Sequence, residues 1–356
     1  MKTENTAVIS TRNYGVDALR IVSMLMIVVA HVFTQGGVLA AAEEGSAGWY
    51  AAWALRIFVL VDVNCFALIT GYTSLDSRFR ASKVVTLWLQ LFVYSVGLSA
   101  LFRMLGTSAF EPMRTFFPVL SGRWWYMTAY FGIVFFLPFM GILMRNLTRR
   151  QASLLVLALI CLFSLLPSVY YRDTFKLQGG YDVAWLAILA LIGGYIRHFE
   201  PFKNVRRRWL IVYVLCMVCI CAWKFLSKST PDRFVNFTSI FALVGSIALL
   251  LFFSRISVAP AVKKLTKFVA PMTLGVYLIH VHPAVWNFVL PGRLAPLAAL
   301  NPAVMLPGVV ASALVIFVVC AAVDWVRGQL FRVLGINKLA EIIGDKLTAL
   351  AERIFK

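Results

Sequence analysis

Long apolar runs dominate this 356-residue sequence and restrict what it can fold into. A helix of about 17–25 apolar residues is long enough to cross the hydrocarbon core of a bilayer. Charged residues make up only 14% of the chain, against about 25% in soluble domains. The sequence therefore predicts an all-α fold, a polytopic transmembrane bundle of ten helices at residues 14–35, 49–72, 84–105, 124–144, 152–168, 183–197, 209–226, 237–257, 270–290 and 306–326.

Basic residues are distributed unequally between the loops that join these runs. If the ten runs cross in succession, 23 of the 34 Lys and Arg residues fall on the side that holds both termini. Cytoplasmic loops of membrane proteins carry an excess of Lys and Arg. We therefore expect both termini to be cytoplasmic. The same distribution accounts for the net charge of +19, so membrane lipid is the expected partner and nucleic acid is not.

The runs predict one membrane domain over residues 1–326, followed by a cytoplasmic amphipathic segment over 327–356. The small residues at 38–42 resemble a signal-peptide cleavage site. The apolar run before them is long and the tail before that run carries the acidic Asp17, so we expect no cleavage. All six cysteines lie inside apolar segments without metal-ligand spacing, which indicates packing residues and no metal.

The first run carries two ionisable residues, Arg20 and His31, separated by ten residues. On a helix this spacing places both side chains on one face, offset by about 16 Å along the axis. Ionisable groups inside a membrane are costly and usually functional. A neutral imidazole can remove a proton from a hydroxyl group at physiological pH, whereas a simpler interpretation is a histidine that only joins two helices. Arg20 can pair with Asp17 on the same face, as an anchor at the membrane surface.

Polar residues also occur in and after the second run. Asp62 and Asn64 lie within the hydrocarbon and need partners inside the bundle, which makes them candidates for substrate binding. Tyr72 follows Gly71, a residue that permits close backbone approach. The basic residues after this run are candidates for binding phosphate groups of a cofactor, together with Tyr72, although topological charge would explain them equally: Arg78, Arg80 and Lys83.

Aromatic residues begin the fourth run at the outer surface, and a histidine lies in the ninth. Trp124, Trp125 and Tyr126 are typical of a membrane-interface belt, and they would also suit a sugar-binding entrance. His280 is a second polar group that can face the interior of the bundle, and we include it among the candidates for substrate binding.

Five motifs occur together in the order known from one family: Arg20-x10-His31, Ile69-Thr70-Gly71-Tyr72, Arg78-x-Arg80, Trp125-Tyr126 and Tyr277-Leu278-Ile279-His280. The chain resembles the acyltransferase family 3 enzymes, bacterial inner-membrane O-acyltransferases of surface polysaccharides. Thr70 stands where the family commonly has serine, which retains a hydroxyl group. The resemblance covers essentially the whole chain.

The resemblance implies an acyl-CoA donor, acetyl-CoA above all, on the cytoplasmic side, and an acceptor hydroxyl on an extracytoplasmic polysaccharide or lipid-linked sugar. It also implies that Arg20 and His31 are required for catalysis, with His31 acting as a general base or as a nucleophile that carries the acyl group. Two alternatives remain at this point. A secondary transporter of a sugar or lipid-linked precursor would use His31 and Asp62 as proton-relay groups, and a membrane sensor would bind ligand without turnover.

Overall fold

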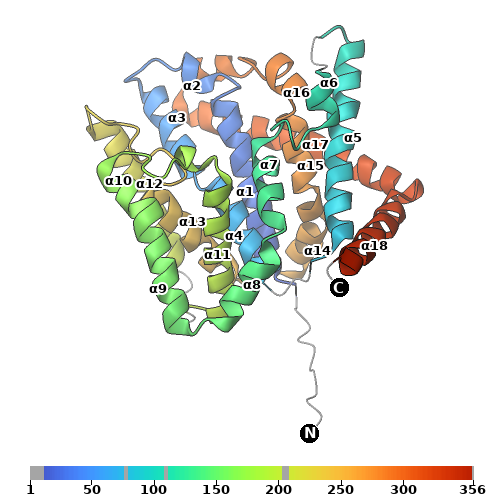
Figure 1. Ribbon diagram of the computed structural model, residues 1–356. Helices are drawn as coiled ribbons and strands as arrows, with labels where there is room; N and C mark the ends of the chain where they lie inside the picture. Colours follow the sequence, from blue (N-terminus) through green and yellow to red (C-terminus); the bar gives the residue numbers. More distant parts are fainter. Residues whose placement is uncertain (1–11, 76–78, 108–110, 203–207, 355–356) are drawn as a thin grey trace.

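The computed structural model describes residues 12–75, 79–107, 111–202 and 208–354, and every regular element in these ranges is a helix (Figure 1). The elements are α1 Tyr14–Phe33, α2 Val38–Ala41, α3 Ala47–Phe58, α4 Asp62–Ser74, α5 Ala81–Met104, α6 Pro112–Phe116, α7 Trp125–Val134, α8 Leu137–Asn146, α9 Arg149–Ile160, η1 Cys161–Leu165, α10 Leu166–Tyr170, η2 Gln178–Gly180, α11 Val183–Phe199, α12 Arg208–Leu226, α13 Ile240–Phe253, α14 Pro260–Val269, η3 Ala270–Met272, α15 Thr273–His280, α16 Pro283–Phe288, η4 Ala295–Ala299, α17 Pro302–Val333 and α18 Ile336–Ile354.

By length and composition, six stretches within the described residues can cross a membrane: Tyr14–Ala41, Ala47–Ser74, Ala81–Met104, Arg149–Tyr170, Arg208–Leu226 and Pro302–Val333. Helices α7 and α8 together make a seventh, bent by 54°. Helices α11 and α13 are apolar but shorter, and the predicted run 270–290 is divided into η3, α15 and α16. The molecule is thus a polytopic helical bundle whose helices follow the predicted apolar runs.

Helix α1 lies in the middle of the bundle in Figure 1 and contacts α3, α4, α13, α14, α15 and α17. Its first turn is fixed by Asn13, whose side-chain oxygen accepts hydrogen bonds from the backbone N–H groups of Gly15 and Val16. The Asn13 amide also donates to the carbonyl of Ser254 at 2.7 Å, which attaches this end of α1 to the end of α13. An Asn cap of this kind satisfies donors that no helical carbonyl can reach.

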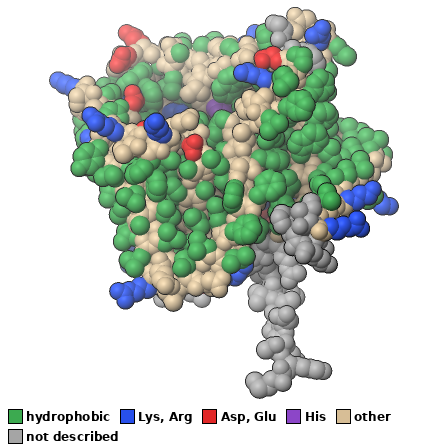
Figure 2. Space-filling view, viewed as in Figure 1, with side chains coloured by type: hydrophobic (Ala, Val, Ile, Leu, Met, Phe, Trp, Pro, Cys, Tyr) green, Lys and Arg blue, Asp and Glu red, His purple; other side chains and the backbone are tan. Residues whose placement is uncertain are grey.

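The outer surface of the bundle is apolar. On α17, Val315, Val318 and Val319 are each more than half exposed. Figure 2 shows hydrophobic side chains over most of one face, with Lys and Arg side chains near its upper and lower edges. Apolar side chains that contact lipid acyl chains avoid the free-energy cost of exposure to water, so this surface fits a lipid environment.

Two glycines allow α4 and α11 to pack with their backbones in contact. A Cβ atom on Gly71 would collide with the backbone oxygen of Ala190, and one on Gly193 would collide with the backbone oxygen of Leu68. Small residues at helix interfaces take this role in membranes, where apolar burial alone does not drive association. The close approach that the sequence indicated at Gly71 is therefore present.

We expect Gly71→Ala to destabilise the protein by about 1–3 kcal/mol, the usual cost of overpacking. The expected readout is a lower thermal midpoint of the detergent-solubilised protein. Gly97→Ala is the matched control, because a Cβ atom on Gly97, in the middle of α5, meets no heavy atom within 4 Å. Equal midpoints for the two variants would contradict the packing argument.

The second predicted run is not one continuous helix, because turns over residues 59–61 divide it into α3 and α4. The Tyr213 hydroxyl of α12 donates a hydrogen bond of 2.5 Å to the carbonyl of Phe58, at the end of α3. Non-helical backbone at membrane depth is tolerated where other groups satisfy it or where it lines a cavity. Arg56 and Asp62, on either side of this break, line the same internal space.

Helix α17 continues to Val333, so the boundary expected at residues 326 and 327 falls inside a helix. Its buried Asp324 accepts hydrogen bonds from Tyr94 and Gln90 of α5 and pairs with Arg327. The predicted amphipathic segment 327–356 contains the end of α17 and the helix α18, which packs against α5. In Figure 1, α18 and the start of α1 lie at the lower end of the bundle, and α6 and α16 at the upper end.

Candidate active site

One internal cavity of about 870 Å³ brings together polar residues from most of the central helices. Arg20 and His31 of α1 both line it, as the helical spacing predicted. Among the other predicted site residues, Asp62, Lys83, Trp125 and Tyr126 line it too. Two of its lining residues are Lys83, in the first turn of α5, and Arg114, in α6. In Figure 1, α5 begins toward the lower end of the bundle and α6 lies at the upper end. The cavity therefore extends between the two ends of the bundle.

His31 is held by a second histidine. Its Nδ1 lies 3.0 Å from Nε2 of His280, and Nδ1 of His280 lies 2.6 Å from the backbone oxygen of Val276. A carbonyl can only accept, so Nδ1 of His280 carries the proton and its Nε2 is an acceptor. Neutral His31 must then carry its proton on Nδ1, which leaves a lone pair on Nε2. The edge-to-face ring of Trp286, with centroids 4.7 Å apart, further fixes the imidazole.

His280 itself is almost fully buried and does not line the cavity. Both of its ring nitrogens are used, one by Val276 and one by His31. Its geometry is that of a residue that orients another histidine and sets its tautomer. His280 was expected to bind substrate, and in the structure it contacts His31.

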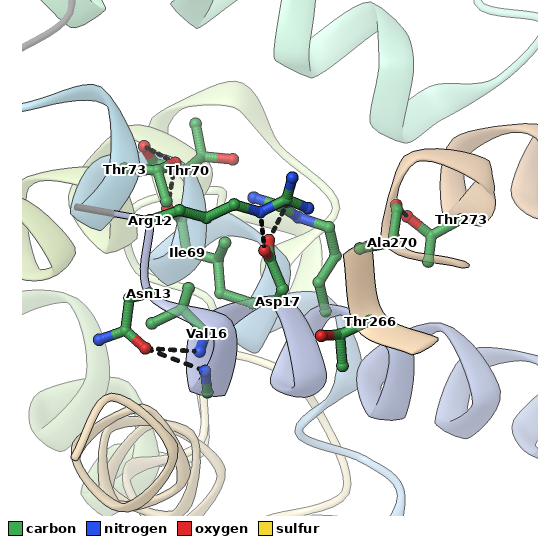
Figure 3. Close-up of polar contacts among 12 residues, drawn as sticks. Arg12, Asn13, Val16, Asp17, Ile69, Thr70, Thr73, Thr266, Ala270 and Thr273 are labelled. Carbon is green, nitrogen blue, oxygen red and sulfur yellow. Dashed lines mark hydrogen bonds and ion pairs between the residues drawn. The ribbon is translucent and has the colours of Figure 1, made fainter. Parts of the chain in front are cut away.

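Arg20 is oriented by a carboxylate that also binds a second arginine. Asp17 Oδ1 lies 3.0 Å from Nη1 of Arg20, and its Oδ2 lies 2.5 Å from Nε of Arg12. The expected pair between Asp17 and Arg20 is thus present. Figure 3 shows Asp17 next to Arg12, with Thr70 on one side and Thr273 on the other. Arg20 lines the cavity and Arg12 does not, so the guanidinium of Arg20 is the group of this cluster that can bind an anionic ligand.

The remaining predicted residues lie elsewhere. Asn64 is fully buried, with its amide donating to the carbonyl of Phe237 and its oxygen accepting from the Trp185 indole, so it joins helices and does not line the cavity. Trp124 is 1% exposed, contacts His282 and does not line the cavity.

Three residues expected to bind the cofactor also lie away from the cavity or cannot be placed. Arg80 is exposed just before α5, outside the lining of the cavity. Tyr72 is half-buried beneath the guanidinium of Arg197 and does not line it either. Arg78 lies outside the described residues. Of the predicted basic cluster, Lys83 alone is both described and in the cavity wall.

Sequence reasoning missed several lining residues. Arg56 lines the cavity and was not among the predicted site residues, although an arginine inside an apolar run is itself a signal of function. Tyr181 and Trp286 gave no signal, because aromatic residues near membrane interfaces are common. No group of three His, Cys, Asp or Glu side chains that could hold a metal ion occurs in the parts of the chain that the structure describes.

Comparison with known protein families decides the class of the molecule. The family model for acyltransferase family 3, described as an acyltransferase domain, matches residues 13–323. The chain belongs to this family. The family resemblance seen in the motifs is thereby confirmed. The match begins at Asn13, the N-cap of α1, and ends at residue 323, ten residues before the end of α17. None of the curated proteins and none of the solved structures matches the chain. With its apolar helices, this family 3 acyltransferase is a multi-pass membrane protein.

Proposed function

We propose that this family 3 acyltransferase moves an acyl group, acetyl in the simplest case, from acyl-CoA to a sugar hydroxyl of an extracytoplasmic polysaccharide or lipid-linked sugar. The observation that carries the proposal is that Arg20 and His31 line one cavity, where the contact of His31 Nδ1 with His280 leaves the Nε2 lone pair of His31 without a hydrogen-bond partner among the described residues. We further propose ten membrane crossings in the bacterial inner membrane with both termini cytoplasmic, on the strength of the excess of Lys and Arg on that side.

In this proposal the donor enters at the end of the cavity that carries Arg20 and Lys83. These two cations suit the phosphate groups and the polar arm of coenzyme A, whereas the highly charged nucleotide itself stays outside the bilayer. The acceptor enters from the end that carries Arg114. The two substrates then meet near His31 without either of them crossing the membrane.

The proposed chemistry is acyl transfer from sulfur to oxygen. His31 Nε2 removes the proton from the acceptor hydroxyl as that oxygen attacks the thioester carbonyl carbon. The tetrahedral intermediate then collapses, the C–S bond breaks, and the coenzyme A thiolate takes the proton back from His31. In the covalent variant the same lone pair attacks the thioester first and expels the coenzyme A thiolate; the acceptor hydroxyl then attacks the acyl-imidazole and its proton passes to the thiolate. Release of one equivalent of free coenzyme A before any acceptor is added identifies the covalent variant.

The test is incubation of the purified protein in liposomes with [14C]acetyl-CoA on the Arg20 side and a panel of oligosaccharides on the other. Labelled oligosaccharide formed together with free coenzyme A supports the proposal. Sugar flux without acetyl-CoA consumption would show a transporter instead. Binding of either compound without any product would show a sensor.

His280 should affect catalysis through His31. We expect His280→Phe to lower kcat by about 10- to 100-fold, the usual loss when an orienting partner of a histidine is removed, with KM for acetyl-CoA little changed. His280→Gln keeps a side-chain acceptor for the Nδ1 proton of His31 and should recover part of the rate. If the Gln and Phe variants lose equal activity, or if KM rises instead of kcat falling, the orienting role is wrong.

A further inference from the structure

The cavity contains a second cluster of polar and aromatic groups that the proposed transfer step does not use. Arg56 belongs to the last turn of α3, and Asp62 is the first residue of α4. Both line the cavity, on either side of the break between the two helices. Trp125, Tyr181 and Phe237 line the same space. This set places a cation, a carboxylate and three aromatic rings around one part of the cavity.

The guanidinium of Arg56 has unused hydrogen-bonding capacity. Its Nη1 atom is buried and has no hydrogen-bond partner in the described part of the chain. Asp62 is 3% exposed and uses Oδ1 to accept from its neighbour Val63 at 2.6 Å. No ion pair joins Arg56 to Asp62 among the described residues, although the two interact electrostatically at longer range. A buried donor without a partner is costly, and a ligand with hydroxyl groups removes that cost.

The aromatic groups form a continuous apolar wall. The ring centroids of Trp125 and Tyr181 are 4.7 Å apart, and those of Tyr181 and Phe237 are 5.1 Å apart. The two faces of a pyranose ring carry C–H groups that pack on aromatic rings, and its edge carries hydroxyl groups. A wall of rings with a few convergent polar groups is therefore suited to one sugar unit.

Charge restricts the kind of sugar. Asp62 accepts from hydroxyl groups and repels a carboxylate, while Arg56 donates to hydroxyl or ring oxygens and balances the charge of Asp62. His31 lines the same cavity as Arg56 and Asp62. A sugar unit bound between Arg56 and Asp62 therefore shares one space with the imidazole of His31.

We infer that Arg56, Asp62, Trp125 and Tyr181 form the acceptor subsite and bind one neutral pyranose unit, with vicinal hydroxyl groups between Arg56 and Asp62 and the C–H face on the rings. The inference rests on the proposed function, because the subsite is assigned to the acceptor of that transfer. It adds to the candidates from the sequence the two residues Arg56 and Tyr181, and it excludes an acidic sugar at this position.

The first test measures binding without turnover. The purified full chain in detergent is titrated calorimetrically, in the absence of acyl-CoA, with neutral trisaccharides of glucose, galactose, mannose and N-acetylglucosamine, and with trigalacturonate. At least one neutral trisaccharide should bind more tightly than trigalacturonate. We expect Asp62→Asn and Arg56→Gln each to weaken that binding about 10-fold or more, since each removes a hydrogen bond to a charged group. Absence of binding by every neutral trisaccharide overturns the inference.

Matched variants separate the subsite from a folding defect. Tyr181→Leu changes a residue outside the helices and should also weaken sugar binding, even where Arg56→Gln fails to fold. Trp88→Leu is the control for Trp125→Leu, because Trp88 is on the exposed face of α5 and does not line the cavity. Sugar binding that is unchanged in Tyr181→Leu and Trp125→Leu contradicts the assignment.

The second test separates this inference from the proposed function. If the wild type transfers acetyl groups but the subsite variants keep its KM for the acceptor, the transfer reaction stands and the subsite is wrong. If neutral sugars bind and the variants weaken them, but the wild type does not consume acetyl-CoA, the subsite stands and the acyltransferase proposal is wrong.

Discussion

Replacing His31 with alanine is expected to lower kcat for acyl transfer by about 10²–10⁴-fold, the range usually lost with a general base. The reason is that Nε2 of His31 carries the lone pair that the network of His280 and Val276 leaves unused. The measurement is the rate of [14C]acetyl transfer by the variant in liposomes, after gel filtration shows that it is folded. The KM for acetyl-CoA should change much less than kcat, because Arg20 and Lys83 remain in place.

A matched control for this variant is His198→Ala. His198 lies in the last turn of α11, contacts Phe199 and does not line the cavity. It should keep wild-type activity. Transfer by His31→Ala at a rate near that of His198→Ala would eliminate His31 as the reacting base or nucleophile and, with it, the proposed mechanism.

The second large effect is expected at Arg20. Arg20→Ala should raise KM for acetyl-CoA by about 10- to 100-fold, as expected for losing a hydrogen bond to a charged group. Arg12→Ala is a stringent control, because Arg12 pairs with the same Asp17 carboxylate but does not line the cavity. If the arginines only stabilise the end of α1, the two variants should behave alike.

The readout is the dependence of initial rate on acetyl-CoA concentration at saturating acceptor, together with the thermal midpoint of each variant. We expect both variants to lower the midpoint, since each leaves the largely buried Asp17 with one partner fewer. Only Arg20→Ala should change KM. A similar KM increase in Arg12→Ala would assign the effect to the geometry of α1 instead of to donor binding.

Most of the helices could be predicted because a membrane helix is encoded by the length of its apolar run. The expected run 14–35 corresponds to α1 at Tyr14–Phe33, and 209–226 corresponds to α12 at Arg208–Leu226. The shared orientation of Arg20 and His31 was predictable for the same reason, since it depends only on the period of one helix. These properties are local, so no knowledge of neighbouring helices was needed.

The break between α3 and α4 could not be predicted from composition. Residues 59–61 are Val, Leu and Val, without the proline or glycine that usually marks a break. At the break, the Tyr213 hydroxyl of the distant α12 donates to the carbonyl of Phe58. Arg56 lines the cavity beside the break, and its place in the site was missed as well.

Roles within the site were also decided by contacts between distant segments. Asn64 and Asp62 are two residues apart on α4. Asn64 is hydrogen-bonded to Phe237 and Trp185, whereas Asp62 lines the cavity. Trp124 and Trp125 are adjacent, yet only Trp125 lines the cavity. Neighbouring positions on a helix point in different directions, and which direction is interior depends on the packing of the other helices.

By itself the sequence determined that this chain is a helical membrane protein of the acyltransferase family, with Arg20 and His31 on one face of its first helix. Apolar length and helical period are properties of a single segment, and the motifs are read directly from residue order. The tertiary structure decided that His31 and His280, 249 positions apart, share a hydrogen bond that sets the free lone pair, and that Arg56 joins them in one cavity. Contacts between residues so far apart in the sequence form only when separate helices pack together. The geometry of each contact therefore depends on how the intervening helices are arranged.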